Sequence, residues 1–263
     1  MAARADPRGV RDVRRPGAAA ARRSRRAPCG PAVSASRWLV LPGLACPASS
    51  FDAVRRLLPA HVSLDVRAHA LTTTAAQALA DGPYHGVVGH SLGGLLALEA
   101  ARTHPDRVPR VLLLDPTRLH EQGPPAPFRR GLLAVARAVT RAPGAARAAA
   151  PVERRIDRWW ARRGVVRTAQ DRGPEAWRHG VDALAAGWDR AARVDALLAT
   201  GPPRAEVVLA VPVRGAARER RADGRLAART GARTVAVRRA GHLLMCDRPD
   251  AVTALLVALS DGP

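Results

Sequence analysis

Residues 84–96 read YHGVVGHSLGGLL, and this stretch decides the fold of the chain. Two valines lead into a G-x-S-x-G pattern formed by Gly89, Ser91 and Gly93, and an alanine- and leucine-rich segment follows directly. This order predicts a buried strand, a sharp turn and a helix. A serine on so tight a turn has a strained backbone, so the positions two before and two after it must be small. The turn would lift the Ser91 hydroxyl clear of the sheet, beside the N-terminus of the helix.

In this context the segment resembles the nucleophile elbow of the α/β-hydrolase family. The resemblance implies a mostly parallel central sheet with helices on both faces and a helical lid insertion. It also implies that Ser91 is the nucleophile and that the backbone amide of Leu92 stabilises the oxyanion that forms beside it. The second donor would be the backbone amide of Leu44, because Pro42-Gly43-Leu44 stands where the family has its oxyanion loop. Proline replaces the family's histidine there, a mild departure since the donor is main-chain.

The remaining segments fit this fold in chain order. Apolar runs at 38–41, 61–66, 110–115, 205–213 and 233–238 predict strands, and helical segments between them predict parallel pairing. Helix-like stretches at 128–140, 152–163 and 174–198 break the alternation, and the resemblance makes them the lid. We therefore predict a disordered Arg/Ala/Pro-rich tail, a first part of the hydrolase core, a helical lid and a second part of the core. Their respective bounds are 1–36, 37–116, 117–204 and 205–263.

Four tryptophans lie in the predicted lid. Large aromatic side chains at this place could line an acyl pocket, or they could simply pack the lid helices together. We expect one or two of the four to face the pocket. They are Trp159, Trp160, Trp177 and Trp188.

A serine hydroxyl needs a neutral imidazole to take its proton before it becomes a useful nucleophile. The chain has eight histidines, but His242 stands apart because it lies just past the last predicted strand, in Ala-Gly-His-Leu-Leu. The resemblance places the catalytic histidine at this point. The predicted order is then nucleophile, acid and histidine, as in this fold.

The acid of the triad is left open among three residues. The family's usual place lies three or four residues past a glycine, which here means Arg218, unable to serve, or Glu219. We rank Glu219 first, Asp223 second on the same segment, and Asp115 third. Asp115 ends the strand at 110–115, where some family members carry the acid instead. An absent acid is the remaining possibility.

Composition narrows the function classes. Basic residues number 43 against 22 acidic ones, yet all the basic ones are arginine and neither lysine nor asparagine occurs, as a GC-rich genome would produce. The charge is therefore weak grounds for a nucleic-acid partner, and we expect no specific one. Three cysteines without metal-ligand spacing favour a reducing compartment, so we predict a cytoplasmic protein. No apolar run of membrane-spanning length occurs, and we expect neither a metal nor a cofactor.

The predicted function is hydrolysis of an ester, thioester or related acyl bond of a small molecule, through an acyl-enzyme on Ser91. The alternative is a catalytically degenerate relative that uses the same pocket to bind a small molecule or a partner. Substrate identity stays open, because fold and triad are shared among unrelated activities. The oligomeric state is open too.

Overall fold

The computed structural model describes residues 35–118, 126–213 and 217–262. The predicted tail lies outside these ranges except for its last two residues. Ser36 is buried and already belongs to the first strand. Its amide N–H donates to the carbonyl of His61 just before β2. The strand therefore begins before the apolar run that predicted it.

Within the described residues, six parallel strands form one sheet in the order β2-β1-β3-β4-β5-β6. The elbow strand β3 lies between β1 and β4, so both neighbours end beside the turn that follows it. This sheet confirms the predicted fold class. The strands are β1 (Ser36–Leu41), β2 (Val62–Val66), β3 (Gly86–His90), β4 (Arg110–Leu114), β5 (Glu206–Pro212) and β6 (Arg233–Val237).

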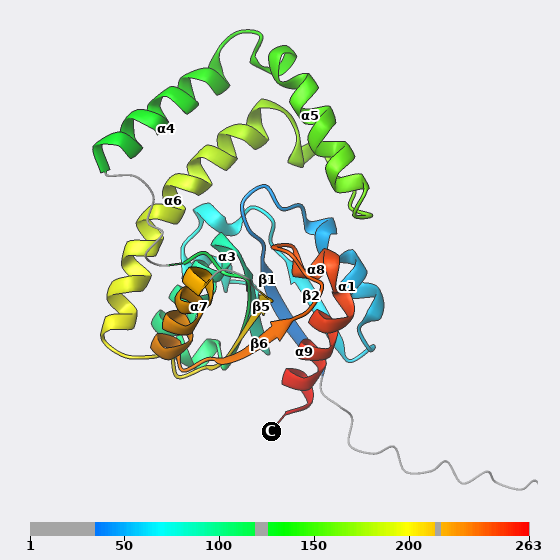
Figure 1. Cartoon of the computed structure of the whole chain (residues 1–263), viewed down its shortest axis with the longest axis vertical. Helices are drawn as coiled ribbons and strands as arrows, with labels where there is room; N and C mark the ends of the chain where they lie inside the picture. The colour runs from blue at the N-terminus through cyan, green and yellow to red at the C-terminus, as the bar shows by residue number, and fades with distance from the viewer. Residues whose placement is uncertain (1–34, 119–125, 214–216, 263) are drawn as a thin grey trace, which may run out of the picture. The chain divides into compact units, whose positions relative to one another are not determined.

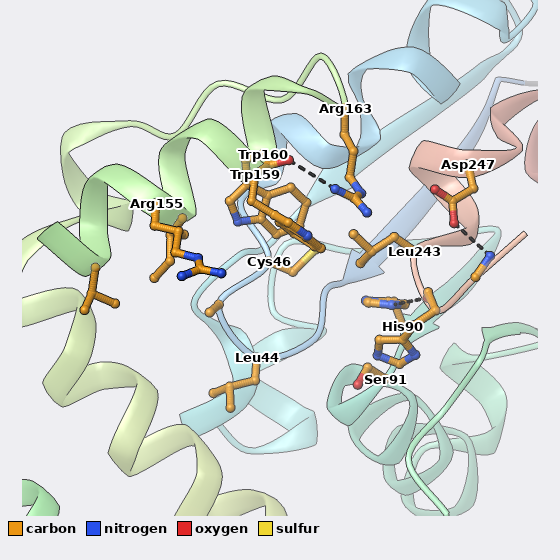
Figure 2. Close-up of a pocket in the computed structure, with 15 residues that line it drawn as sticks. Leu44, Cys46, His90, Ser91, Arg155, Trp159, Trp160, Arg163, Leu243 and Asp247 are labelled. Carbon is orange, nitrogen blue, oxygen red and sulfur yellow. Dashed lines mark hydrogen bonds between the residues drawn. The ribbon is translucent and has the colours of Figure 1, made fainter.

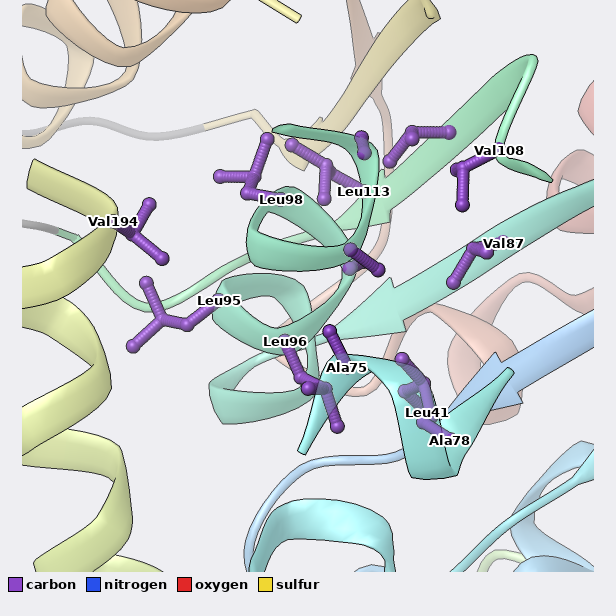
Figure 3. Close-up of a cluster of buried hydrophobic side chains, with 14 of the residues drawn as sticks. Leu41, Ala75, Ala78, Val87, Leu95, Leu96, Leu98, Val108, Leu113 and Val194 are labelled. Carbon is purple, nitrogen blue, oxygen red and sulfur yellow. The ribbon is translucent and has the colours of Figure 1, made fainter. Parts of the chain in front are cut away.

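Alternate side chains of the strands build two hydrophobic cores, one on each face of the sheet. Leu41, Val87 and Leu113 point to the face covered by α2, α3 and α7 and by the later turns of α6 (Figure 3). Burying a leucine or valine completely stabilises the fold by about 1.5–3 kcal/mol. The bounds of these helices are α2 (Ala75–Ala78), α3 (Leu92–Thr103), α6 (Gly173–Ala199) and α7 (Ala217–Thr230).

The opposite face carries Trp38, Val88 and Leu112, each the immediate sequence neighbour of a residue on the first face. They are fully buried beneath α1, α8 and α9. The inner strands β1, β3, β4 and β5 are buried on both faces, which explains their continuous apolar runs, whereas the edge strands β2 and β6 are partly exposed and carry polar residues. The bounds are α1 (Asp52–Leu57), α8 (Leu244–Asp247) and α9 (Pro249–Asp261).

Among the described residues between β4 and β5, three α-helices are inserted, as the sequence pattern predicts (Figure 1). They are α4 (Ala126–Arg141), α5 (Ala145–Ala161) and α6. Helix α5 begins before the predicted start at 152 and continues through Pro151. The break expected at this proline, which lacks the N–H that bonds to the preceding turn, does not occur.

A buried arginine of α6 ties the insertion to the core. The Arg190 guanidinium donates to a Glu99 carboxylate oxygen at 2.6 Å and to the carbonyls of Leu71 at 2.7 Å and Thr73 at 2.6 Å. A buried cation is tolerated when it is paired and hydrogen-bonded, and here each of the three guanidinium nitrogens donates to an acceptor. Arg190 thereby fixes where α6 leaves the core.

Close backbone contacts surround the elbow. A Cβ added to Gly93 would lie 1.9 Å from the carbonyl oxygen of Leu41, and one added to Gly89 would lie 2.6 Å from the Cα of Gly94. Both separations are far below a permissible contact. The small residues of the G-x-S-x-G pattern are therefore required by the packing of β1, β3 and α3.

We predict that Gly93→Ala destabilises the protein severely, because the new methyl group overlaps backbone atoms that cannot move independently of β1. Gly224→Ala is the matched control, since a Cβ on Gly224 in α7 meets nothing within 4 Å. The control should be neutral or more stable by about 0.5–1 kcal/mol, because alanine suits a helix interior better than glycine. Urea unfolding of both variants measures this. Equal stabilities would contradict the close packing.

Candidate active site

The backbone of Ser91 is strained and held from both sides. Its φ is 51° and its ψ is −122°, values that a non-glycine residue rarely adopts. The amide N–H donates to the carbonyl of Leu114 at 3.2 Å, and the Ser91 carbonyl accepts from the amides of Gly94 and Thr117, each at 3.0 Å. Neighbouring elements thus hold this serine in its unfavourable conformation at the start of α3.

His242 and Asp115 form a hydrogen-bonded pair next to this turn. The His242 Nδ1 lies 2.7 Å from a carboxylate oxygen of Asp115. Asp115 directly follows β4 and is buried, with a positive φ of 41° that aspartate tolerates better than most residues. The carboxylate fixes the imidazole with its proton on Nδ1, which leaves the lone pair of Nε2 available to accept a proton.

The structure places Asp115, the third-ranked candidate for the acid, beside His242 Nδ1, the position expected of Glu219. Glu219 lies in the first turn of α7, and Asp223, further along the same helix, is buried with a carboxylate oxygen 3.4 Å from Arg118. The physical reason is the strand order. Because β4 pairs directly with β3, the residue after β4 emerges next to the turn that bears Ser91, whereas the residues after β5 emerge one strand further away.

Sequence reasoning did not identify His90 as part of the site. Its Nδ1 accepts the amide N–H of Gly43 at 3.3 Å, and its Nε2 lies 3.0 Å from the carbonyl oxygen of His242. Complete burial, helped by nearby His242, lowers the pKa of His90 to about 4. The ring is therefore neutral and carries its proton on Nε2. The His90 ring joins the loop after β1 to the segment that bears His242. In the sequence, only the position of His90 next to Ser91 could have indicated this role.

The two predicted oxyanion donors lie on segments that border Ser91. Leu92 is the first residue of α3, so its amide belongs to the unpaired N–H groups of a helix start. Leu44 follows Gly43, whose backbone approaches Ser91 so closely that an added Cβ would lie 2.7 Å from the Ser91 Cβ. That both amides serve as oxyanion donors remains a prediction.

A cavity of about 590 Å³ opens over Ser91 (Figure 2). Its floor comes from the core and includes His90 and His242, whereas its roof comes from α5 and the residues just after it. Trp159 and Trp160 line it, as expected for one or two of the four tryptophans. The complete lining is Leu44, Ala45, Cys46, His90, Ser91, Val152, Arg155, Ile156, Trp159, Trp160, Arg163, Gly241, His242, Leu243 and Asp247.

The other two tryptophans lie elsewhere. Trp177 borders a neighbouring cavity of about 370 Å³, and its indole N–H donates to the carboxylate of Glu153. The Trp188 ring lies beneath the guanidinium of Arg129, 5.7 Å from its central carbon. Trp177 therefore has a packing and hydrogen-bonding role within the insertion, and Trp188 packs against α4.

Other chemistries find little support in the described residues. No three His, Cys, Asp or Glu side chains within residues 35–118, 126–213 and 217–262 are grouped to hold a metal ion. Burial raises the pKa of the Cys46 thiol to about 12 and that of Cys246 to about 11, so both thiols stay protonated and packed. Within the same part of the chain, no helix combines the length and apolarity needed to cross a bilayer.

A family model matches the chain. The model of the alpha/beta hydrolase fold matches residues 48–211, more than half of the chain, and includes the elbow and Asp115. No curated protein matches the chain in a sequence search.

Solved structures of low sequence identity share the fold. NosK from Streptomyces actuosus matches with a TM-score of 0.55 and 18% identity over 86% of this chain and 97% of its own. A thermophilic esterase from Thermogutta terrifontis matches with a TM-score of 0.57 and 21% identity over 85% and 89%. A putative epoxide hydrolase from Pseudomonas aeruginosa gives 0.57 and 18% over 86% and 88%. At identities this low, the similarity supports a shared fold and nothing more.

We predict that His90 makes folding stability depend on pH. Its pKa is lowered from 6.5 to about 4 in the folded state, so between these values the unfolded chain binds the proton and the folded chain does not. This contribution to stability is complete above about pH 6.5 and is lost as the pH falls toward 4. In His90→Gln the free energy of unfolding should lose this part of its dependence on pH. Urea unfolding of parent and variant above pH 6.5 and between pH 4 and 6.5 measures this dependence. The same change in the free energy of unfolding with pH in both proteins would refute the prediction.

Proposed function

The chain belongs to the α/β-hydrolase fold family, and on this basis we propose that it is a serine hydrolase acting on an ester, thioester or related acyl bond of a small molecule. The observation that carries the proposal is the Asp115–His242 hydrogen bond beside Ser91 on its strained turn. Ser91 and His242 border the same cavity. A nucleophile, a base and a group that orients the base are the three parts that acyl transfer requires.

In the first half of the reaction Ser91 is acylated. As its oxygen attacks the acyl carbon, its proton passes to His242 Nε2, and the Asp115 carboxylate stabilises the imidazolium that forms. The amides of Leu44 and Leu92 donate to the oxyanion of the tetrahedral intermediate. His242 then gives the proton to the leaving oxygen or sulfur, and the bond between that atom and the acyl carbon breaks.

In the second half water releases the acyl group. His242 takes a proton from the water as it attacks the acyl carbon of the Ser91 ester, and the same two amides hold the new oxyanion. The proton returns to the serine oxygen when the ester bond breaks. The products are the free acid and the original enzyme, so no further reactant is needed.

The insertion would act as a lid over this chemistry. Residues of α5 supply apolar side chains to the roof of the cavity, including Ile156 and Trp160. Trp159 and Trp160 would contact the acyl chain. The protonated thiols of Cys46 and Cys246 fit our proposal of a cytoplasmic setting.

The competing reading, a catalytically degenerate binding protein, loses its main support. It rested on the missing carboxylate at the usual position and on Pro42. The carboxylate of Asp115, which follows β4, lies beside His242 Nδ1. The backbone of the loop that contains Pro42 lies against Ser91. These contacts favour an enzyme.

We expect Ser91→Ala to abolish labelling by a fluorophosphonate probe and to lower ester turnover by several orders of magnitude. The remaining activity would come from the oxyanion donors alone. Gel fluorescence and release of 4-nitrophenol from simple esters measure the two effects. Labelling of the variant at the parent's level would overturn the proposed function.

We expect Asp115→Asn to lower kcat strongly while the fold stays intact, because asparagine also tolerates a positive φ but cannot stabilise imidazolium. In a serine protease the corresponding loss is about ten-thousandfold. Glu219→Gln is the matched control and should be mild. The assignment fails if the control loses as much activity as Asp115→Asn, or if both variants keep it.

A further inference from the structure

Two arginines of the insertion reach the cavity over Ser91. Arg155 comes from α5, and Arg163 follows the end of that helix. Figure 2 shows both side chains directed from the insertion toward the space that Ser91 borders from the other side. A site for a neutral acyl chain has no need of two cations in its roof.

Arg163 is held in place by an aromatic neighbour. Its central guanidinium carbon lies 3.9 Å from the centroid of the Trp159 ring, and its Nη1 donates to the Trp159 carbonyl at 3.1 Å. Stacking on an aromatic face leaves other N–H groups of the guanidinium fork free to bind a ligand. Arg163 is thus oriented before any substrate arrives.

Arg155 differs from several other arginines of the insertion. Arg137 is paired with Asp182 at 2.8 Å, and Arg167 is paired with Glu153 at 2.6 Å. Within the described part of the chain, the Arg155 guanidinium has no hydrogen-bond acceptor or carboxylate partner. Its charge is therefore available to a group inside the cavity.

The acidic side chains near the cavity do not cancel these charges. Asp247 is the acidic residue of the lining, and its carboxylate accepts the amide N–H of Gly241 at 2.8 Å. Asp115 lies behind His242 and is bonded to its ring. The roof therefore presents a net positive charge to the space above Ser91.

We propose that Arg155 and Arg163 select substrates whose acyl chain ends in an anionic oxygen group, a carboxylate or a phosphate. This inference rests on the proposed function and names its substrate class. The planar guanidinium fork binds both oxyanion types through paired N–H···O bonds. The acyl chain would cross the apolar wall of Ile156, Trp160 and Leu243, with its carbonyl at Ser91 and its charged end at the two arginines.

The test compares three 4-nitrophenyl esters of similar length: the hexanoate, which is neutral, the hydrogen adipate, which ends in a carboxylate, and the 5-phosphonopentanoate. We expect kcat/KM to be higher for at least one anionic ester than for the hexanoate, chiefly through a lower KM. Whichever anionic ester reacts faster distinguishes carboxylate from phosphate. The preference should weaken with added salt, because both arginines are exposed to solvent.

The double variant Arg155→Gln and Arg163→Gln should lower the ratio of anionic to neutral kcat/KM by about tenfold or more, the loss expected for charge-assisted bonds. The ratio is taken within each variant, so a change in hexanoate turnover that affects all three esters equally cancels, and circular dichroism shows whether the double variant folds. Arg154→Gln is the matched control on α5, since Arg154 is not among the residues lining the cavity. A ratio unchanged in the double variant, or lowered equally in the control, overturns the proposal.

A binding measurement separates this inference from the proposed function. Calorimetry with the Ser91→Ala protein should detect binding of adipate or 5-phosphonopentanoate that is weakened at least tenfold when both arginines are replaced. If no ester is turned over but this binding occurs, the proposed function fails and the anion site stands. If the hexanoate is hydrolysed at Ser91 but neither anion binds, only the anion site fails.

Discussion

Contact between backbones at the turn after β3 is the constraint on which the rest of the structure depends. Gly93 lies against the Leu41 carbonyl and Gly89 against Gly94, so β1, β3 and α3 meet where no Cβ fits. This approach forces Ser91 into its strained conformation and brings the loop after β1 against it. The energetic cost of the strained residue is offset by the buried sheet around it, which forms two hydrophobic cores. Ser91 and the loop after β1 are therefore placed by packing and not by their own interactions.

His242, the proposed base, is positioned by side chains from two strand ends. Asp115 after β4 binds His242 Nδ1, while His90 at the end of β3 binds the His242 carbonyl and the Gly43 amide. Both are buried, and His90 is neutral because burial lowers its pKa. Rigid strands thus orient a histidine that belongs to a loop and whose side chain is itself half exposed. A site held in this way needs little rearrangement when substrate binds, which is the condition for strong electrostatic stabilisation.

How far the sequence predicted this molecule depended on whether the signal was local. The elbow, the buried strands and the parallel sheet follow from short patterns, and the structure confirms them. The pairing of Asp115 with His242 spans 127 positions and follows from the strand order, which a run of apolar residues does not reveal. Spacing from a glycine favoured Glu219, yet that segment is the start of α7. His90 was missed because its partners are backbone groups of two distant loops.

The central claim is that Ser91 carries the acyl group between the two halves of the reaction. The most direct measurement is mass spectrometry of the protein quenched in acid shortly after mixing with a 4-nitrophenyl ester, followed by digestion. The account predicts a mass increase equal to the acyl group on the peptide that contains Ser91, formed before the slower release of acid and absent from Ser91→Ala. Turnover with no such adduct, or with the acyl group on another residue, would contradict it.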